Sequence, residues 1–167
     1  MKLDSLEKLY VHELKDLYSA ETQLLDAIPK MEQAASDDEL KQAFAEHLRE
    51  TRAHVTRLER IFSEMDFAPG GHRCDAMEGL IEEGESLLKS DIEPNVLDAA
   101  LVAAAQRVEH YEMAGYGTAR AYAEKLGRHE AADLLQQTLN EEGHANQTLT
   151  RLAERSLNFL AMQATHE

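Results

Sequence analysis

The chain has 167 residues, which is the length of one domain, and its 17 Lys and Arg residues against 32 Asp and Glu residues give a formal net charge of −15. Such a negative chain repels phosphate backbones and anionic headgroups, so we expect no nucleic-acid partner and no membrane partner. An apolar content of 43%, 3 Pro residues and no Trp favour long helices in a globular fold over a disordered chain or a fold of many short strands.

Apolar side chains recur every three or four positions between residues 3 and 32, which predicts a first helix with a kink or an early end near Pro29. A capping box then predicts the start of a second helix, with Ser36 accepting from the amide of Glu39 and Glu39 reaching back. The apolar seam of this second helix consists of Leu40, Phe44, His47, Thr51, His54, Leu58, Ile61 and Met65. Because the connecting loop is short, these two helices should be antiparallel neighbours.

The apolar pattern weakens between residues 70 and 93, which predicts a crossover connection with a short amphipathic helix interrupted at Gly84. A third helix is expected to begin at Pro94 and to close at Leu126 and Gly127. A fourth helix follows almost at once, near residue 129.

The pattern of the fourth helix extends to Leu152 and continues or restarts through Leu160. Two short-looped hairpins joined by one long crossover are typical of ferritin-like bundles. The sequence therefore predicts an all-α, ferritin-like four-helix bundle that occupies residues 1–167 as a single domain.

Acidic residues interrupt the apolar seams of the first and fourth helices. Glu21 lies between Leu17 and Leu24, and Glu142 occupies the position between Thr138 and Ala145. Burying an unpaired carboxylate costs several kcal/mol, so each group should be neutralised, paired or bound to a metal. In the second helix Glu50 and His54 lie one turn apart on one side, and in the third Glu109 and Glu112 share a face.

These acids also lie at similar levels along the predicted bundle. If the first helix ends near residue 32 and the second begins near residue 37, Glu21 and Glu50 are almost equally far from the turn between them. At about 1.5 Å per residue, their levels differ by about 3 Å. In the second hairpin the turn lies between residues 126 and 129. Glu112 lies about as far before this turn as Glu141 and Glu142 lie after it. Both hairpins thus place acids near mid-helix.

Five or more carboxylates with one or two imidazoles suit iron or manganese better than a thiolate-seeking metal. Di-iron bundles use one Glu from each of two helices and a Glu-x-x-His from each of the others. Glu141 and His144 have this spacing, whereas the histidine after Glu50 comes four residues later, at His54. Glu142 fits the apolar seam but Glu141 completes the motif, so either acid of the fourth helix can be the one that points inward.

Four segments together carry a family resemblance: Leu17–Glu21, His47–Thr51, Arg107–Glu112 and Glu141–Glu142. With them the chain resembles, over nearly its whole length, the YciE/YciF family of bacterial stress proteins within the ferritin-like superfamily. The resemblance implies a homodimer and a di-iron type site formed by Glu21, Glu50, Glu109, Glu112 and Glu142. Glu109 and Glu112 are also similar to the paired third-helix acids of rubrerythrin, and Glu141–His144 is similar to the fourth helix of bacterioferritin.

Several other side chains have expected supporting roles. His47 and His110 should hold a carboxylate of the site from outside it, as metal sites require. Tyr18 and Tyr116 are expected to pack as aromatic residues of the bundle. The single cysteine, Cys74, lies in the crossover and is expected to be an incidental thiol.

The candidate metal ligands are therefore Glu21, Glu50, His54, Glu109, Glu112, Glu141, Glu142 and His144. They are expected to hold two iron ions per chain, with manganese as the alternative metal. The leading hypothesis is a redox protein whose metal reduces O2 or a peroxide, as a ferroxidase, peroxidase or oxidase would. The alternative is a non-catalytic helical stress protein or scaffold whose buried acids pair with histidines or hold a single ion. With one cysteine and no apolar leader, a reducing cytoplasm is the expected location.

Overall fold

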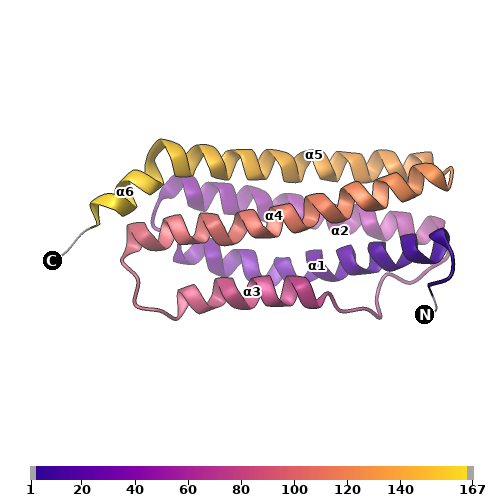
Figure 1. Cartoon of the computed structure of the whole chain (residues 1–167), viewed down its shortest axis with the longest axis horizontal. Coiled ribbons are helices and arrows are strands. Elements are labelled where there is room, and N and C mark those ends of the chain that lie inside the picture. Colours follow the sequence, from indigo (N-terminus) through magenta and orange to yellow (C-terminus); the bar gives the residue numbers. More distant parts are fainter. Residues whose placement is uncertain (1–2, 165–167) are drawn as a thin grey trace.

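The computed structural model describes residues 3–164, and within that range the chain is helical and contains no strand (Figure 1). Its elements are α1 (Leu6–Ala34), α2 (Asp38–Glu64), α3 (Asp75–Leu88), α4 (Pro94–Lys125), α5 (His129–Leu152), the π-helical segment η1 (Ala153–Leu157) and α6 (Asn158–Gln163). The predicted all-α architecture is confirmed. None of the helices in the described range combines the length and the apolar character needed to cross a membrane.

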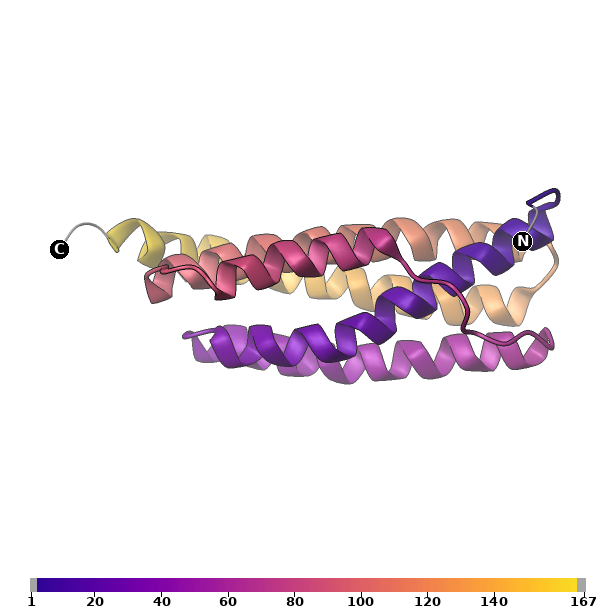
Figure 2. The same ribbon diagram turned by 90° about the horizontal axis from the view of Figure 1, so that it is seen from below.

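The four long helices form two antiparallel hairpins, α1 with α2 and α4 with α5, which pack against each other along their length (Figures 1 and 2). The connection from α2 to α4 runs the length of the bundle and carries α3, which packs on α4 and α1. This is the predicted pair of hairpins with one long crossover.

The loop between α1 and α2 differs from the capping box expected there. Asp37, not Ser36, is the N-cap of α2, and its carboxylate accepts hydrogen bonds from the amides of Glu39 and Leu40. The amides of Ser36 and Asp37 donate instead to the two oxygens of the buried Asp98 on α4, at 2.8 and 2.9 Å. A contact between the hairpins therefore fixes this loop, and the predicted box is wrong.

Within the described residues, the first helix does not end early at Pro29 and the crossover helix is not interrupted at Gly84. The first helix continues through Pro29 to Ala34, and α3 continues through Gly84 to Leu88. The close of α4 agrees with the prediction, because Gly127 follows the C-cap Leu126 with a φ of +70°, a conformation that glycine adopts without steric cost.

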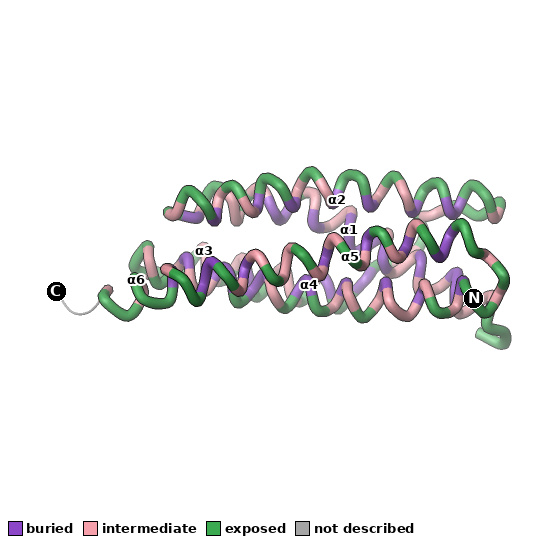
Figure 3. The backbone as a smooth tube through the Cα atoms, turned by 90° about the horizontal axis from the view of Figure 1, so that it is seen from above, coloured by how far each residue is buried: buried purple, intermediate pink, exposed green. Residues whose placement is uncertain are grey.

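Buried positions recur along each long helix and face the other helices (Figure 3). They form two separate apolar clusters, one toward each end of the bundle. One cluster includes Leu24, Ile28, Leu40, Phe44, Leu101 and Leu149. The other includes Tyr10, Leu14, Leu58, Ile61, Tyr116 and Leu135.

A layer of buried polar side chains lies between these clusters, at the middle of all four long helices. Its members are Glu21, His47, Thr51, His54, Glu109, Glu112, Thr138 and Glu142. Acids from both hairpins thus occur at one level of the bundle, as their positions in the sequence predict. The site therefore lies where the apolar core is interrupted, between the two clusters.

Candidate metal centre

Two overlapping groups of acidic and imidazole side chains make up the centre of this layer. One group consists of His47, Glu109, Glu112 and Glu142, and the other consists of Glu21, His54 and Glu142. Every member is buried, and within each group one ligand atom per residue lies within 4.8 Å of the others. Ligands on opposite sides of an ion with bonds of about 2.1 Å lie about 4.2 Å apart, so small side-chain movements would enclose a cation.

The His54 group is held together by direct contacts. The Nδ1 atom of His54 lies 3.1 Å from Oε1 of Glu21 and 3.0 Å from Oε1 of Glu142. The hydroxyl of Tyr116 donates a hydrogen bond of 2.5 Å to the same oxygen of Glu21. Burial alone would lower the pKa of His54, but the charges and hydrogen bonds of Glu21 and Glu142 outweigh it and raise the pKa to about 11.

The His47 group lacks such partners. Within residues 3–164, neither ring nitrogen of His47 and neither oxygen of Glu112 has a hydrogen-bond partner, and Oε2 of Glu109 has none. The ring lies 3.4 Å from Oε1 of Glu109 and 3.9 Å from Oε2 of Glu142. Burial, together with the charge of Glu142, raises the pKa values of Glu109 and Glu112 well above their ordinary range. His47 and Glu112 thus lack the hydrogen bonds that buried polar groups normally make.

Of the two acids that the sequence left open on α5, Glu142 points inward and Glu141 turns to the side. Arg57 donates to both oxygens of Glu141, at 2.5 and 2.9 Å. One of these oxygens lies 2.9 Å from Nε2 of His54. Although burial would raise the pKa of Glu141, the hydrogen bonds and charge of Arg57 lower it. Glu141 is therefore a carboxylate, and it accepts the proton of His54 Nε2, which turns Nδ1 toward the buried acids.

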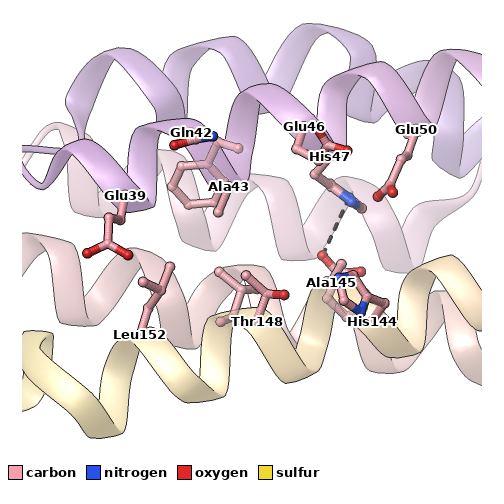
Figure 4. Close-up of a pocket in the computed structure, with 13 residues that line it drawn as sticks. Glu39, Gln42, Ala43, Glu46, His47, Glu50, His144, Ala145, Thr148 and Leu152 are labelled. Atoms are coloured by element: carbon pink, nitrogen blue, oxygen red, sulfur yellow. Dashed lines mark ion pairs between the residues drawn. The ribbon is translucent and has the colours of Figure 1, made fainter.

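The other two sequence-predicted ligands, Glu50 and His144, lie outside both groups. They face each other across a groove between α2 and α5 (Figure 4). Glu50 is half-buried and His144 is exposed. The position on α2 that points inward is Thr51, whose hydroxyl donates to the carbonyl of His47.

The remaining expectations have mixed outcomes. His47, expected to support the site from outside, is a member of a buried group, and its place on the apolar seam of α2 is the signal that indicates this. His110 is exposed and binds the carbonyl of Gln106, so it does not reach the centre. Tyr116 contacts Glu21, whereas Tyr18 donates to Glu59 away from the centre.

Cys74 is buried and is the N-cap of α3. Its thiol donates to Asp16 at 3.1 Å and lies 3.0 Å from the hydroxyl of Tyr111, which also donates to Asp16. The cysteine is thus part of a polar contact between α3, α1 and α4, and it belongs to neither candidate metal group.

Comparison with known proteins gives consistent matches over nearly the whole chain. The model of DUF892, a domain of unknown function, matches residues 5–161. Protein YciF of Escherichia coli (strain K12) is 45% identical over 159 residues, which are 95% of this chain and 96% of that protein.

Solved structures agree with this match. The crystal structure of the E. coli stress protein YciF has a TM-score of 0.90 at 44% identity and covers 93% of this chain and 99% of that chain. YcfI of Rhodopseudomonas palustris has a TM-score of 0.85 at 41% identity, and the match covers 90% of this chain and 97% of that chain. A protein of Xanthomonas campestris pv. campestris has a TM-score of 0.75 at 18% identity and shares the fold. That match covers 96% of this chain and 100% of that chain.

Proposed function

The chain belongs to the DUF892 family, and from the buried groups at its centre we propose that it is a stress-associated metalloprotein that binds two redox-active ions. The ligands would be Glu21, His54 and Glu142 for one ion and His47, Glu109, Glu112 and Glu142 for the other. Glu142 would serve both ions, because it contributes an atom to each group.

The observation that carries this proposal is the set of unpartnered polar atoms around Glu112. Each buried oxygen or nitrogen without a hydrogen bond costs free energy, and several of them in one layer would be a large defect in a stable core. A cation bound between them would supply the missing partner to all of them at once. It would also offset the mutual repulsion of the carboxylates, which contributes to the raised pKa values of Glu109 and Glu112.

The donor set favours iron or manganese among the metals of the cell. Carboxylate oxygens outnumber imidazole nitrogens in both groups, and neither group contains a thiolate. Soft metals prefer sulfur ligands, whereas a mixed set of oxygen and imidazole suits iron and manganese. These metals change valence by one electron, which is the chemistry they would supply for the reduction of O2 or a peroxide.

The surrounding residues would hold the ligands in place. The hydroxyl of Tyr116 fixes one oxygen of Glu21, and Glu141 holds the Nε2 proton of His54. Arg57 in turn holds Glu141 with two hydrogen bonds. The apolar clusters bury the layer from either end of the bundle, and a groove between α2 and α5 reaches it at His47 and Glu109.

A non-catalytic scaffold is the second candidate, and one observation favours it. With its raised pKa, His54 is protonated at neutral pH and forms ion pairs with both Glu21 and Glu142. In that half of the layer the charges of Glu21 and Glu142 are therefore balanced by His54 without an ion. In a scaffold, the acids of the other half would stay protonated in the core.

Anaerobic titration of the full-length chain with Fe(II), followed by elemental analysis, distinguishes these functions. About two ions per chain are expected in the parent protein, and Glu142→Gln should reduce binding to less than about half an ion because it removes the shared ligand. Glu82→Gln removes the same charge from the exposed face of α3 and should change nothing. Circular dichroism would establish that each variant is folded.

Exposure of the loaded protein to air or peroxide then tests the redox part. The near-ultraviolet absorbance of Fe(III) should appear faster with the parent chain than with free Fe(II) in the same buffer. If the folded parent protein binds less than about half an ion per chain, the metal site is contradicted and the non-catalytic scaffold is the remaining function. Binding without faster oxidation would contradict the redox activity alone.

A further inference from the structure

A groove of about 390 Å³ lies between α2 and α5 and extends down to the buried layer. One part of it is apolar and includes Phe44, Leu149 and Leu152. The other part is polar, with Glu50 and His144 at its sides and with His47 and Glu109 among its lining residues (Figure 4).

We propose that this groove is the route by which a divalent cation reaches the buried layer, with the carboxylate of Glu50 as its first charged contact. The proposal rests on the metal-binding function proposed above. It assigns to Glu50 a role in uptake rather than in final coordination.

The inner wall of the groove consists of residues that are also members of a candidate metal group. His47 and Glu109 line the groove and belong to the group around Glu112. His47 is 7% exposed, and among the described residues neither of its ring nitrogens has a hydrogen-bond partner. Nε2 of His47 lies 3.4 Å from Oε1 of Glu109. A cation that moves along the groove therefore meets unpartnered ligand atoms where the groove ends.

Glu50 differs from the other acids that line the groove. Glu39 forms an ion pair with Arg155, and Glu46 forms one with Arg49. No hydrogen bond or ion pair engages Glu50 anywhere in the described part of the chain, so its carboxylate is free to contact a cation. Glu50 and Glu109 both line the groove, so the free carboxylate and the buried metal group open onto the same space.

The charge of the groove selects for cations. An acid without a counter-ion at a half-buried position attracts positive ions and repels anions, and the overall charge of −15 adds to this effect. The volume of the groove, about 390 Å³, leaves space for a cation that keeps part of its hydration shell. His144 on the opposite side adds an imidazole, a ligand that divalent transition metals accept.

The rate of Co(II) uptake by the metal-free full-length chain tests this route. Stopped-flow absorbance would follow binding to the parent protein and to Glu50→Gln, which keeps the shape of the side chain but removes its charge. One unit charge about 6 Å from a divalent cation in a water-like dielectric accounts for about a tenfold difference, so uptake should slow about tenfold. Charge reversal in Glu50→Lys should slow it further, and added salt should slow the parent protein more than Glu50→Gln.

The matched control is again Glu82→Gln on α3, which should take up Co(II) at the parent rate. The final Co(II) content of the parent protein, Glu50→Gln and Glu82→Gln should be equal. Equal uptake rates for the parent and Glu50→Gln would overturn the route. A lower final content in Glu50→Gln would also overturn it, because Glu50 would then be a ligand. A parent protein that binds no Co(II) would contradict the proposed function itself and the route with it.

Discussion

Replacing Glu112 with leucine should make the metal-free protein more stable while it weakens metal binding. The side chain of Glu112 is fully buried, and within the described residues neither of its oxygens has a hydrogen-bond partner. An unsatisfied buried polar group costs about 1–3 kcal/mol, and leucine of similar length removes this cost without a large cavity. The free energy of unfolding should rise by about that amount, which corresponds to about 2–4 °C in melting temperature for each kcal/mol.

The gain in stability should also depend on pH. Burial and the charges of Glu142 and Glu21 raise the pKa of Glu112, so the folded chain holds this proton more tightly than the unfolded chain does. The contribution of Glu112 to stability is therefore complete below its ordinary pKa of 4.5 and is lost as the pH rises toward its raised value. The advantage of Glu112→Leu over the parent should grow as the pH rises above 4.5.

Urea denaturation in the presence of a chelator measures this effect, and elemental analysis after loading measures the accompanying loss of metal. Glu141→Leu is the matched control, because Glu141 has Arg57 as its partner. This control should lower the free energy of unfolding by about 1–3 kcal/mol, since it leaves the partly buried guanidinium unpaired. A decrease in stability for metal-free Glu112→Leu, comparable to that of the control, would refute the view that Glu112 is an unsatisfied group in the absence of a cation.

Three further predictions concern residues outside the centre. Asp98→Ala should lower the free energy of unfolding by about 1–3 kcal/mol, because two loop amides lose their acceptor; denaturation curves that match the parent would contradict this. Gly127→Ala should lower the free energy of unfolding by about 1 kcal/mol, because alanine adopts the positive φ of this position only with strain. The variant should keep the metal content of the parent, and an altered metal content would contradict the placement of Gly127 outside the metal centre. Burial raises the pKa of the Cys74 thiol, and we expect iodoacetamide, followed by mass spectrometry, to modify it about 100-fold more slowly in the folded chain than in urea; equal rates would disprove its burial.

The fold is predictable because its determinants are local. Apolar spacing within each helix and the lengths of the connections predict two hairpins and a crossover without reference to distant residues. The α1–α2 loop is not predictable in this way. Its amides bind Asp98, which lies far along the chain on α4, and no local pattern marks that contact.

The level of the centre along the bundle is also predictable, but the direction of each side chain is not. Neighbouring residues in a helix differ by about 100° in direction, so a seam assigned one position off exchanges an inward residue for a lateral one. On the second helix the predicted seam is correct, since it includes the inward Thr51, but Glu50 lies beside that seam, one turn from His54, and the structure leaves it outside both groups. The difference in direction between neighbours is why the choice between Glu141 and Glu142 needs the structure, in which Arg57 engages Glu141.

The most direct test of the metal centre is anomalous diffraction from crystals of the iron- or manganese-loaded protein, recorded at the absorption edge of the metal. Two anomalous peaks are expected in the middle of the bundle. One peak should contact Glu21, His54 and Glu142, and the other His47, Glu109, Glu112 and Glu142. A loaded crystal with no peak in this layer, or with peaks only at surface carboxylates, would contradict the proposed centre.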